Sequence, residues 1–345
     1  MRNAPSSTSR HPVTHQMWGW IDLDFVNIGV SVVHFAQGLL TLYIGLSKKD
    51  EVDWMFKGKF GLVEQYPQWH NGSFVPGVSE GFEYVGNDKY HITLDTTSVG
   101  YFDVRWAVPS FFFMSFLFQA TASLIPRMEW AGDTNFTKWN PIVRYIEYSF
   151  SGTLVLLCIA VESGVCQWMT LFCMAILSFV TMLLGLIADF TFILGSEQVR
   201  KGVNTEYHSV NLWMWVFPHV LSWVSCVASY FPIAYTFGTS ITSSDLKPPV
   251  FVYVIVLLEA FLFFCFGFVQ TYELWVSSLC VQDAASKAKG KKVDDPTQPL
   301  MGNTEVVSED EENTHKFSVF MYILLSAVAK TLLGWLIFGP IMAGR

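Results

Sequence analysis

The stretch Tyr322-Ile-Leu-Leu-Ser-Ala-Val-Ala-Lys-Thr-Leu-Leu-Gly-Trp335 places one lysine, Lys330, near the middle of an apolar segment. An ionisable side chain at the centre of a bilayer is unfavourable by about 2.5 to 3.5 kcal/mol, so it requires a partner, an ion pathway or a cofactor. Lys330 is too deep in the segment to reach an interface by extending its side chain. It can therefore act as a structural ion pair or coupling residue, or its amine can condense with an aldehyde to give a Schiff base.

The composition of the whole chain also indicates that it lies in a lipid bilayer. The 345 residues are 52% hydrophobic and only 14% charged, which is too apolar for an ordinary soluble enzyme. Seven apolar segments are long enough to cross a hydrocarbon core, which takes ~20 helical residues. These segments are 23–46, 105–125, 141–161, 166–188, 211–237, 249–279 and 317–343. We predict an all-α fold in which residues 1–345 form a single seven-transmembrane-helix bundle.

Lysine and arginine in the connections predict the orientation, because positive charge stays on the cytoplasmic side of short loops. If the N-terminus is cytoplasmic, eleven of these residues lie inside. Outside are Lys247, Arg345 and five lysines in the loop 47–104, whose length weakens the rule. We expect a multi-pass membrane protein with a cytoplasmic tail at 1–20, a cytoplasmic N-terminus and an extracellular or lumenal C-terminus.

Two of the connections between the predicted helices are long, and their sequences predict different structures. The extracellular loop 47–104 alternates apolar and polar residues around 82–92, with Gly-Asn-Asp between, which predicts a short β-hairpin or else an irregular loop. The connection 282–316 is first Lys-rich and then acidic, with almost no aromatics, and predicts a disordered cytoplasmic linker. The net charge of -8 argues against nucleic acid as a partner. The six cysteines include no CxxC pair, so we predict no metal site.

Glu147, in Arg144-Tyr-Ile-Glu-Tyr-Ser149, is the natural partner for Lys330. In the chosen orientation it approaches the lysine from the cytoplasmic side. A protonated Schiff base needs a nearby anion, because opposite charge favours the charged form. Arg144 lies one turn away on the same helix and would help to keep Glu147 ionised. The alternative is that Arg144 and Glu147 are an interfacial ion pair on one helix face.

Four further polar side chains lie at similar depth in the first two segments. His34 and Gln37 share one helix face at a spacing of three. Gln119 follows one turn after Ser115 in the second segment. Each is either a hydrogen-bonded core residue or a member of a proton network around Lys330.

These stretches together resemble the heliorhodopsin family, which consists of seven-helix retinal proteins inverted relative to other microbial rhodopsins. The resemblance lies in His34-Phe-Ala-Gln-Gly38, in Arg144-Tyr-Ile-Glu-Tyr-Ser149 and in Ser326-Ala-Val-Ala-Lys-Thr-Leu-Leu-Gly-Trp335. It covers roughly 20–280 and 317–343. The family's cytoplasmic N-terminus and long extracellular first loop agree with the charge count.

The resemblance implies a role for each matching residue. Lys330 would bear all-trans retinal, Glu147 would be the counterion, and Ser326 would hydrogen-bond near the Schiff base. Tyr148 and Trp335 would line the polyene, and His34 would share the Schiff-base proton on the cytoplasmic side. The chain departs from the family at Gln119, where well-studied members have a histidine, so a two-histidine proton acceptor is not expected. The linker 282–316 is also longer than usual.

The leading functional hypothesis is a light sensor whose cytoplasmic surface changes shape for a signalling partner. A light-driven or light-gated proton transporter is the first alternative, with Glu259 as an outer relay. The second is a transporter or receptor without a chromophore. No nucleotide, metal or nucleophile motif occurs in the loops, so we do not expect an enzyme. The expected partners are membrane lipid, a second copy in a homodimer, and a cytoplasmic signalling partner.

Overall fold

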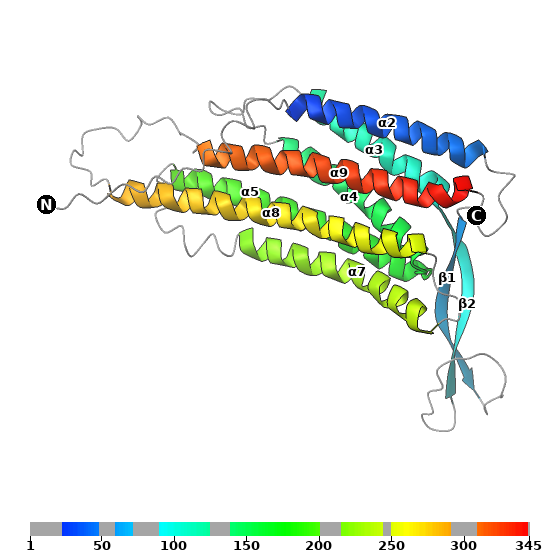
Figure 1. Cartoon of the computed structure of the whole chain (residues 1–345). Coiled ribbons are helices and arrows are strands. Elements are labelled where there is room, and N and C mark those ends of the chain that lie inside the picture. The colour runs from blue at the N-terminus through cyan, green and yellow to red at the C-terminus, as the bar shows by residue number, and fades with distance from the viewer. Residues whose placement is uncertain are drawn as a thin grey trace.

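The chain forms long helices because backbone N–H and C=O groups inside a bilayer have no water to bond, and a helix satisfies them within one segment. The computed structural model describes residues 23–47, 59–71, 90–124, 139–200, 215–243, 250–290 and 309–343. In these ranges seven long helices run side by side (Figure 1). They are α2 Leu23–Ser47, α3 Val104–Leu124, α4 Trp139–Glu162, α5 Trp168–Arg200, α7 Phe217–Ser243, α8 Val250–Gly290 and α9 Glu309–Ala343. The predicted tail 1–20 lies outside the described residues.

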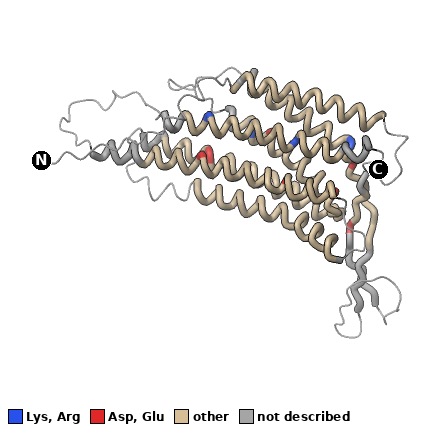
Figure 2. Tube along the Cα trace, viewed as in Figure 1, with Lys and Arg blue, Asp and Glu red and all other residues tan. Residues whose placement is uncertain are grey.

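The helices have the length and surface of membrane spans. Among the described residues, six helices are long and apolar enough to cross a bilayer, and α3 is the seventh helix of the bundle. Large apolar side chains such as Phe231 of α7 and Phe261 of α8 are exposed on the outside, where lipid would cover them. Figure 2 shows few charged positions along the helices. The protein is therefore a seven-helix membrane bundle.

Two helices form the inside of this bundle. Within their apolar windows, 56% of α4 and 50% of α9 is buried, against 22% of α2. Neighbouring helices in the chain pack against each other, and α9 returns to α2. α2 begins at one end of the bundle, and α9 ends at the other, beside a β-hairpin (Figure 1). We call these the opposite end and the hairpin end.

The hairpin joins α2 to α3, as the sequence predicted, but its strands lie elsewhere in the loop. Strand β1, Lys59–Asn71, pairs antiparallel with β2, Tyr90–Asp103, and the register shifts between Leu62 and Val63. Residues 90–92 pair with residues 69–71, so the prediction of strands on both sides of a turn within 82–92 is wrong for this part. The longer alternating stretch 59–71 offers more pairing and sets the register. Residues 72–89 are outside the described ranges.

The hairpin is anchored to the turn between α4 and α5. Gly164, with φ +94°, follows the end of α4, and a left-handed backbone of this kind favours glycine. The N–H of Val165 donates to the carbonyl of Ala160 at 2.9 Å, and that of Gly164 donates to Val161 at 3.1 Å, as in a Schellman motif. The turn presents the Cys166 carbonyl, which accepts a 3.0 Å bond from the Val63 N–H.

Part of the predicted disordered linker is helical. α8 continues to Gly290 and α9 begins at Glu309, so the prediction of disorder is wrong for 282–290 and 309–316. Hydropathy falls where a helix leaves the apolar region, but helix formation does not stop there. The segment after 282 is rich in Ala and Lys, which favour helix, and acidic residues at the start of α9 suit the helix dipole. Residues 291–308 are not described.

Candidate functional site

Lys330 of α9 lies at the centre of the site. Its Nζ donates to Glu147 Oε1 of α4 at 2.8 Å, and also donates to Ser115 Oγ of α3. The Lys330 and Glu147 side chains are each only 5% exposed. Three helices therefore bring together residues that are far apart in the chain, and a lysine buried this deeply meets a carboxylate and a hydroxyl.

Two further side chains surround the amine. Ser326, one turn before Lys330, is buried and lines the same cavity as Lys330. The ring of Tyr148 lies 5.4 Å from Nζ, and its hydroxyl donates to the Tyr322 carbonyl at 3.1 Å. Tyr148 and Ser326 line the same cavity as Lys330, and the roles predicted for them toward retinal stay predictions.

Some polar residues of α2 and α3 lie beside Lys330, and others lie where α2 and α3 pack against each other. Gln37 donates to Thr331 Oγ1 at 2.9 Å and so ties α2 to α9 beside Lys330. His34 is fully buried, and its ring lies 5.8 Å from that of Phe112. Gln119 is buried too, and its Oε1 has no partner, whereas its backbone carbonyl accepts from Asn27 at 3.0 Å.

Arg144 belongs to a separate polar cluster toward the opposite end. Its guanidinium lies 3.8 Å from Asp189 Oδ2 and 4.0 Å from the centre of the Tyr322 ring. The Tyr145 hydroxyl donates to Asp189 at 2.7 Å, and Gln270 Nε2 donates to Tyr145 Oη at 2.7 Å and to Asp189 Oδ1 at 3.0 Å. We call Arg144, Tyr145, Asp189, Gln270 and Tyr322 the Arg144 cluster. The prediction that Arg144 supports Glu147 directly is corrected: its carboxylate partner is Asp189.

Sequence reasoning missed several residues of this region. Asp189 and Gln270 lie in apolar stretches of α5 and α8, and a second pair joins α8 to α9, with His315 Nδ1 2.5 Å from Glu273 Oε1. An acid within an apolar segment is itself a signal for a functional or paired residue. That signal was available for Asp189 and Glu273, but only the fold shows that α4, α5, α8 and α9 bring these groups together.

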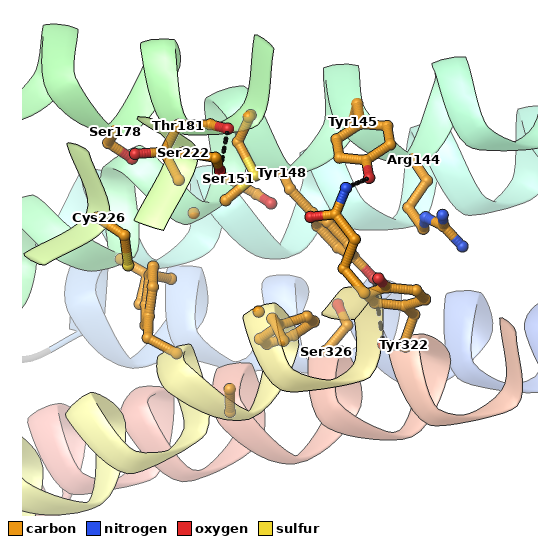
Figure 3. Close-up of a pocket in the computed structure, with 18 of the residues that line it drawn as sticks. Arg144, Tyr145, Tyr148, Ser151, Ser178, Thr181, Ser222, Cys226, Tyr322 and Ser326 are labelled. Atoms are coloured by element: carbon orange, nitrogen blue, oxygen red, sulfur yellow. Dashed lines mark hydrogen bonds between the residues drawn. The ribbon is translucent and has the colours of Figure 1, made fainter. Parts of the chain in front are cut away.

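A cavity opens beside Lys330 between α4, α5, α7, α8 and α9 (Figure 3). Its walls are mainly aromatic and apolar. They include Tyr148, Trp223, Phe263, Phe266 and Ala329. Lys330 forms part of one wall. Arg144, Tyr145 and Tyr322 of the Arg144 cluster close one side of the cavity (Figure 3). An apolar space with a buried lysine in its wall suits an elongated hydrophobic aldehyde such as retinal.

Gly267 shapes the aromatic wall. A Cβ at this position would lie 2.6 Å from Cζ2 of Trp223, so only glycine lets α8 approach the indole of α7. The Trp223 ring stacks on Phe264, with ring centres 6.0 Å apart and an interplanar angle of 7°. The indole is therefore fixed in place as one flat side of the cavity, which fits a conjugated chain.

Two predicted site residues lie away from the cavity. Trp335 is 40% exposed and is not among the residues that line this cavity, so its contact with the polyene stays a prediction. Five residues turn a helix by about 140° beyond a full turn, which puts Trp335 on another face than Lys330. Glu259 of α8 is fully buried, but neither of its oxygens has a hydrogen-bond partner. Within the described part of the chain, no hydrogen bond joins it to Lys330.

A seven-helix membrane bundle with a buried lysine and carboxylate beside an aromatic cavity has the architecture of a rhodopsin. The sequence model of the heliorhodopsin family matches residues 23–276, so this chain belongs to the heliorhodopsin family. A search of curated proteins gave no match. The family match ends before α9, so the position of Lys330 opposite Glu147 is a separate observation from the structure.

Proposed function

We propose that this heliorhodopsin is a light sensor in which Lys330 holds all-trans retinal as a Schiff base and Glu147 is the counterion. The observation that carries the proposal is the position of Lys330 Nζ: it is buried, 2.8 Å from Glu147, and beside an aromatic cavity. When bound, retinal supplies the absorption of visible light and a double bond that isomerises. The family membership supports a retinal photoreceptor in general.

The residues around Nζ would hold and then receive its proton. Glu147 stabilises positive charge at Nζ, because an opposite charge nearby favours the protonated form. Ser115 accepts a second hydrogen bond from Nζ, and Ser326 lies one turn before Lys330 on the same helix. A proton that leaves Nζ in the light would pass to this polar group, which lies on the Glu147 side of the amine.

The Arg144 cluster would transmit the change to the end of the bundle. Arg144 is three residues from Glu147 on α4, and the cluster also includes residues of α5, α8 and α9. A change in charge at Glu147 alters the field at Arg144 through about one turn of helix. Because four helices meet at the cluster, a shift in its bonding would move their ends relative to one another.

We place the opposite end in the cytoplasm, as the distribution of Lys and Arg predicts. The protein would then present these helix ends to a cytoplasmic partner, and it would work as a sensor and not as an enzyme. An epitope tag at the N-terminus should be inaccessible on intact cells, and one after Arg345 should be accessible. The reverse labelling would refute this orientation.

Expression with and without added retinal tests the function directly. The wild-type protein should form a coloured pigment, and Lys330→Ala should form none, because no other amine would lie beside Glu147. Lys316→Ala, on the same helix, is the matched control and should stay coloured. A colourless wild-type protein, or visible absorbance retained in Lys330→Ala, would remove the assignment.

Proton transport is the second candidate, and Glu259 is the observation that favours it. Its carboxyl group is buried and has no hydrogen-bond partner among the described residues, so it could serve as a relay in the hairpin half of the bundle. The homodimer predicted from the sequence would sequester part of the exposed apolar surface. Crosslinking in native membranes, followed by sizing, would detect it.

A further inference from the structure

Glu273 of α8 and His315 of α9 form a charged pair nearer the opposite end than the Arg144 cluster. His315 Nδ1 lies 2.5 Å from Glu273 Oε1. The two side chains are 20% and 16% exposed, against 5% each for Lys330 and Glu147. His315 also lies at the edge of the apolar span of α9, which begins at residue 313. The pair is therefore closer to the medium than the buried site is.

Helix spacing connects this pair to the Arg144 cluster. Glu273 follows Gln270 by three residues on α8, so the two share one helix face. His315 precedes Tyr322 by seven residues, about two turns, and these two share one face of α9. The guanidinium of Arg144, 4.0 Å from the centre of the Tyr322 ring, is close enough for its charge to act on Glu273.

The charges of these groups balance only with an additional proton. Arg144 supplies one positive charge, and Asp189 and Glu273 supply two negative charges when both are ionised. A neutral His315 leaves one net negative charge, whereas a protonated His315 makes the group neutral. Net charge is unfavourable in a poorly solvated place, and an imidazolium forms a charge-assisted hydrogen bond with a carboxylate. The group therefore favours one extra proton on the Glu273–His315 pair.

The other titratable groups near the pair are neutral or lie on other helix faces. Tyrosine is neutral near pH 7, which applies to Tyr145 and Tyr322. Lys316, the next residue after the histidine, lies about 100° away from it around α9. His219 of α7 contacts Thr271 at 2.9 Å, on another face of α8 than the pair.

We propose that the Glu273–His315 pair is a proton-release group, which gives a proton to the medium at the opposite end when the Schiff base deprotonates and takes one back as the pigment recovers. The inference rests on the proposed function, in which the proton of Lys330 Nζ passes to the Glu147 side. The released proton comes from the pair and not from the Schiff base. Because an equal proton returns at the same end, no net transport results.

The trigger is the loss of charge at Glu147. Along the helix axes Glu147 is ~4.5 Å from Arg144, whereas Lys330 is ~12 Å from Tyr322, whose ring lies beside Arg144. Proton transfer to the Glu147 side removes the nearer negative charge together with the more distant positive charge, so the potential at Arg144 becomes more positive. The guanidinium is then attracted more strongly toward Glu273. A cation that moves toward this carboxylate displaces the proton from the pair.

A pH-sensitive dye in weakly buffered solution tests the release. Full-length pigment with all-trans-retinal, in lipid nanodiscs, is excited by a flash, and the dye signal and the visible spectrum are recorded together. The wild type should acidify the medium transiently, by at most one proton per excited molecule. The signal should decay as the spectrum of the dark state returns. A pigment that deprotonates in the light with no change in pH, or with a transient alkalinisation, overturns the inference.

Two variants locate the source of the proton. Glu273→Gln and His315→Phe each remove one half of the pair and should abolish the dye signal, while the visible band and its light-driven deprotonation remain. Glu64→Gln is the matched control, because it makes the same change in the hairpin, where Glu64 accepts from the Met169 N–H at 3.2 Å. It should keep the wild-type signal. A signal that persists in both pair variants, or that Glu64→Gln also removes, overturns the inference.

The outcomes separate this inference from the proposed function. A protein that forms no pigment overturns both. A pigment that deprotonates in the light without a transient release overturns the inference alone. A transient acidification that the wild type and Glu64→Gln show, and that both pair variants lack, supports it.

Discussion

The two halves of the bundle on either side of Lys330 differ in the polarity of their buried side chains. Toward the opposite end, the Arg144 cluster and the Glu273–His315 pair place charged groups from four helices in contact. Toward the hairpin end, the largest core cluster is apolar, with fully buried residues such as Phe111, Ile159 and Leu333. Glu259 lies apart from any partner in the described residues. Lys330 thus has charge on one side and hydrocarbon on the other.

This asymmetry explains why a light-driven event at Lys330 would be transmitted in one direction. Polar networks have alternative bonding arrangements that a nearby change in charge can select. A close-packed apolar core has no such alternatives and resists displacement. The hairpin half therefore acts as a rigid base, also held by the strand that bonds the α4–α5 turn. The other half is the part that can respond.

Replacement of one glutamate by glutamine in each half should give the largest difference between the halves, measured in the visible spectrum of the pigment. In the retinal-loaded protein, Glu147→Gln removes the negative charge 2.8 Å from Nζ. Most of the pigment should then be deprotonated at pH 7, with its band shifted to shorter wavelength and restored by acid. Glu259→Gln should leave the band in place. A pH titration of the visible spectrum checks both variants, and the opposite result would make Glu259 the counterion.

Removal of an arginine should also affect the two halves unequally. Arg144→Leu leaves Asp189 buried without its cation and should reduce the free energy of unfolding by about 3 to 5 kcal/mol. Arg105 pairs with Asp103 at 2.8 Å near the hairpin, where both side chains are 17% exposed. Arg105→Leu should have an effect below about 1 kcal/mol. Unfolding of the purified proteins in detergent provides the measurement, and equal losses would contradict the comparison.

In the apolar half, we expect stability to depend on how well the buried side chains fill the core and not on charge. Leu333 of α9 is fully buried in the core, so Leu333→Ala should lower the free energy of unfolding by about 2 to 4 kcal/mol. Leu324 on the same helix is 43% exposed, and Leu324→Ala serves as the control with little expected effect. The Leu333→Ala pigment should keep the wild-type absorption maximum. A shifted maximum would show that this half also tunes the site.

The smallest expected effect is the steady photocurrent, which should be absent. Net proton transport requires access to Nζ from both ends of the bundle, and the residues beyond Lys330 toward the hairpin include the buried apolar Leu333 and Ile337. Voltage clamp of cells that express the pigment should record at most a transient from charge that moves within the protein. A sustained current that disappears in Glu259→Gln would replace the sensor with a proton transporter.

The sequence predicted the helices well because their signal is local. Seven apolar segments appear as seven helices, and hydropathy placed their centres correctly. The ends were less accurate: α5, α8 and α9 continue past the apolar stretches, since a helix outside the lipid is stabilised by residues that hydropathy scores as polar. The strand pairing in the first loop was also misplaced, because register depends on the partner strand and not on one stretch.

For the site, the sequence by itself determined that a lysine as deep as Lys330 needs a partner or a cofactor, because burying its charge in an apolar segment is unfavourable. It also indicated Glu147 as that partner, since Glu147 is a second charged residue in an apolar segment. Only the tertiary structure decided which groups meet. It paired Arg144 with Asp189, put Ser115 against the lysine and turned Trp335 outward. The physical reason is that a helical sequence fixes how far apart residues lie along one axis, whereas the rotation of each helix and its neighbours are set by packing among all seven.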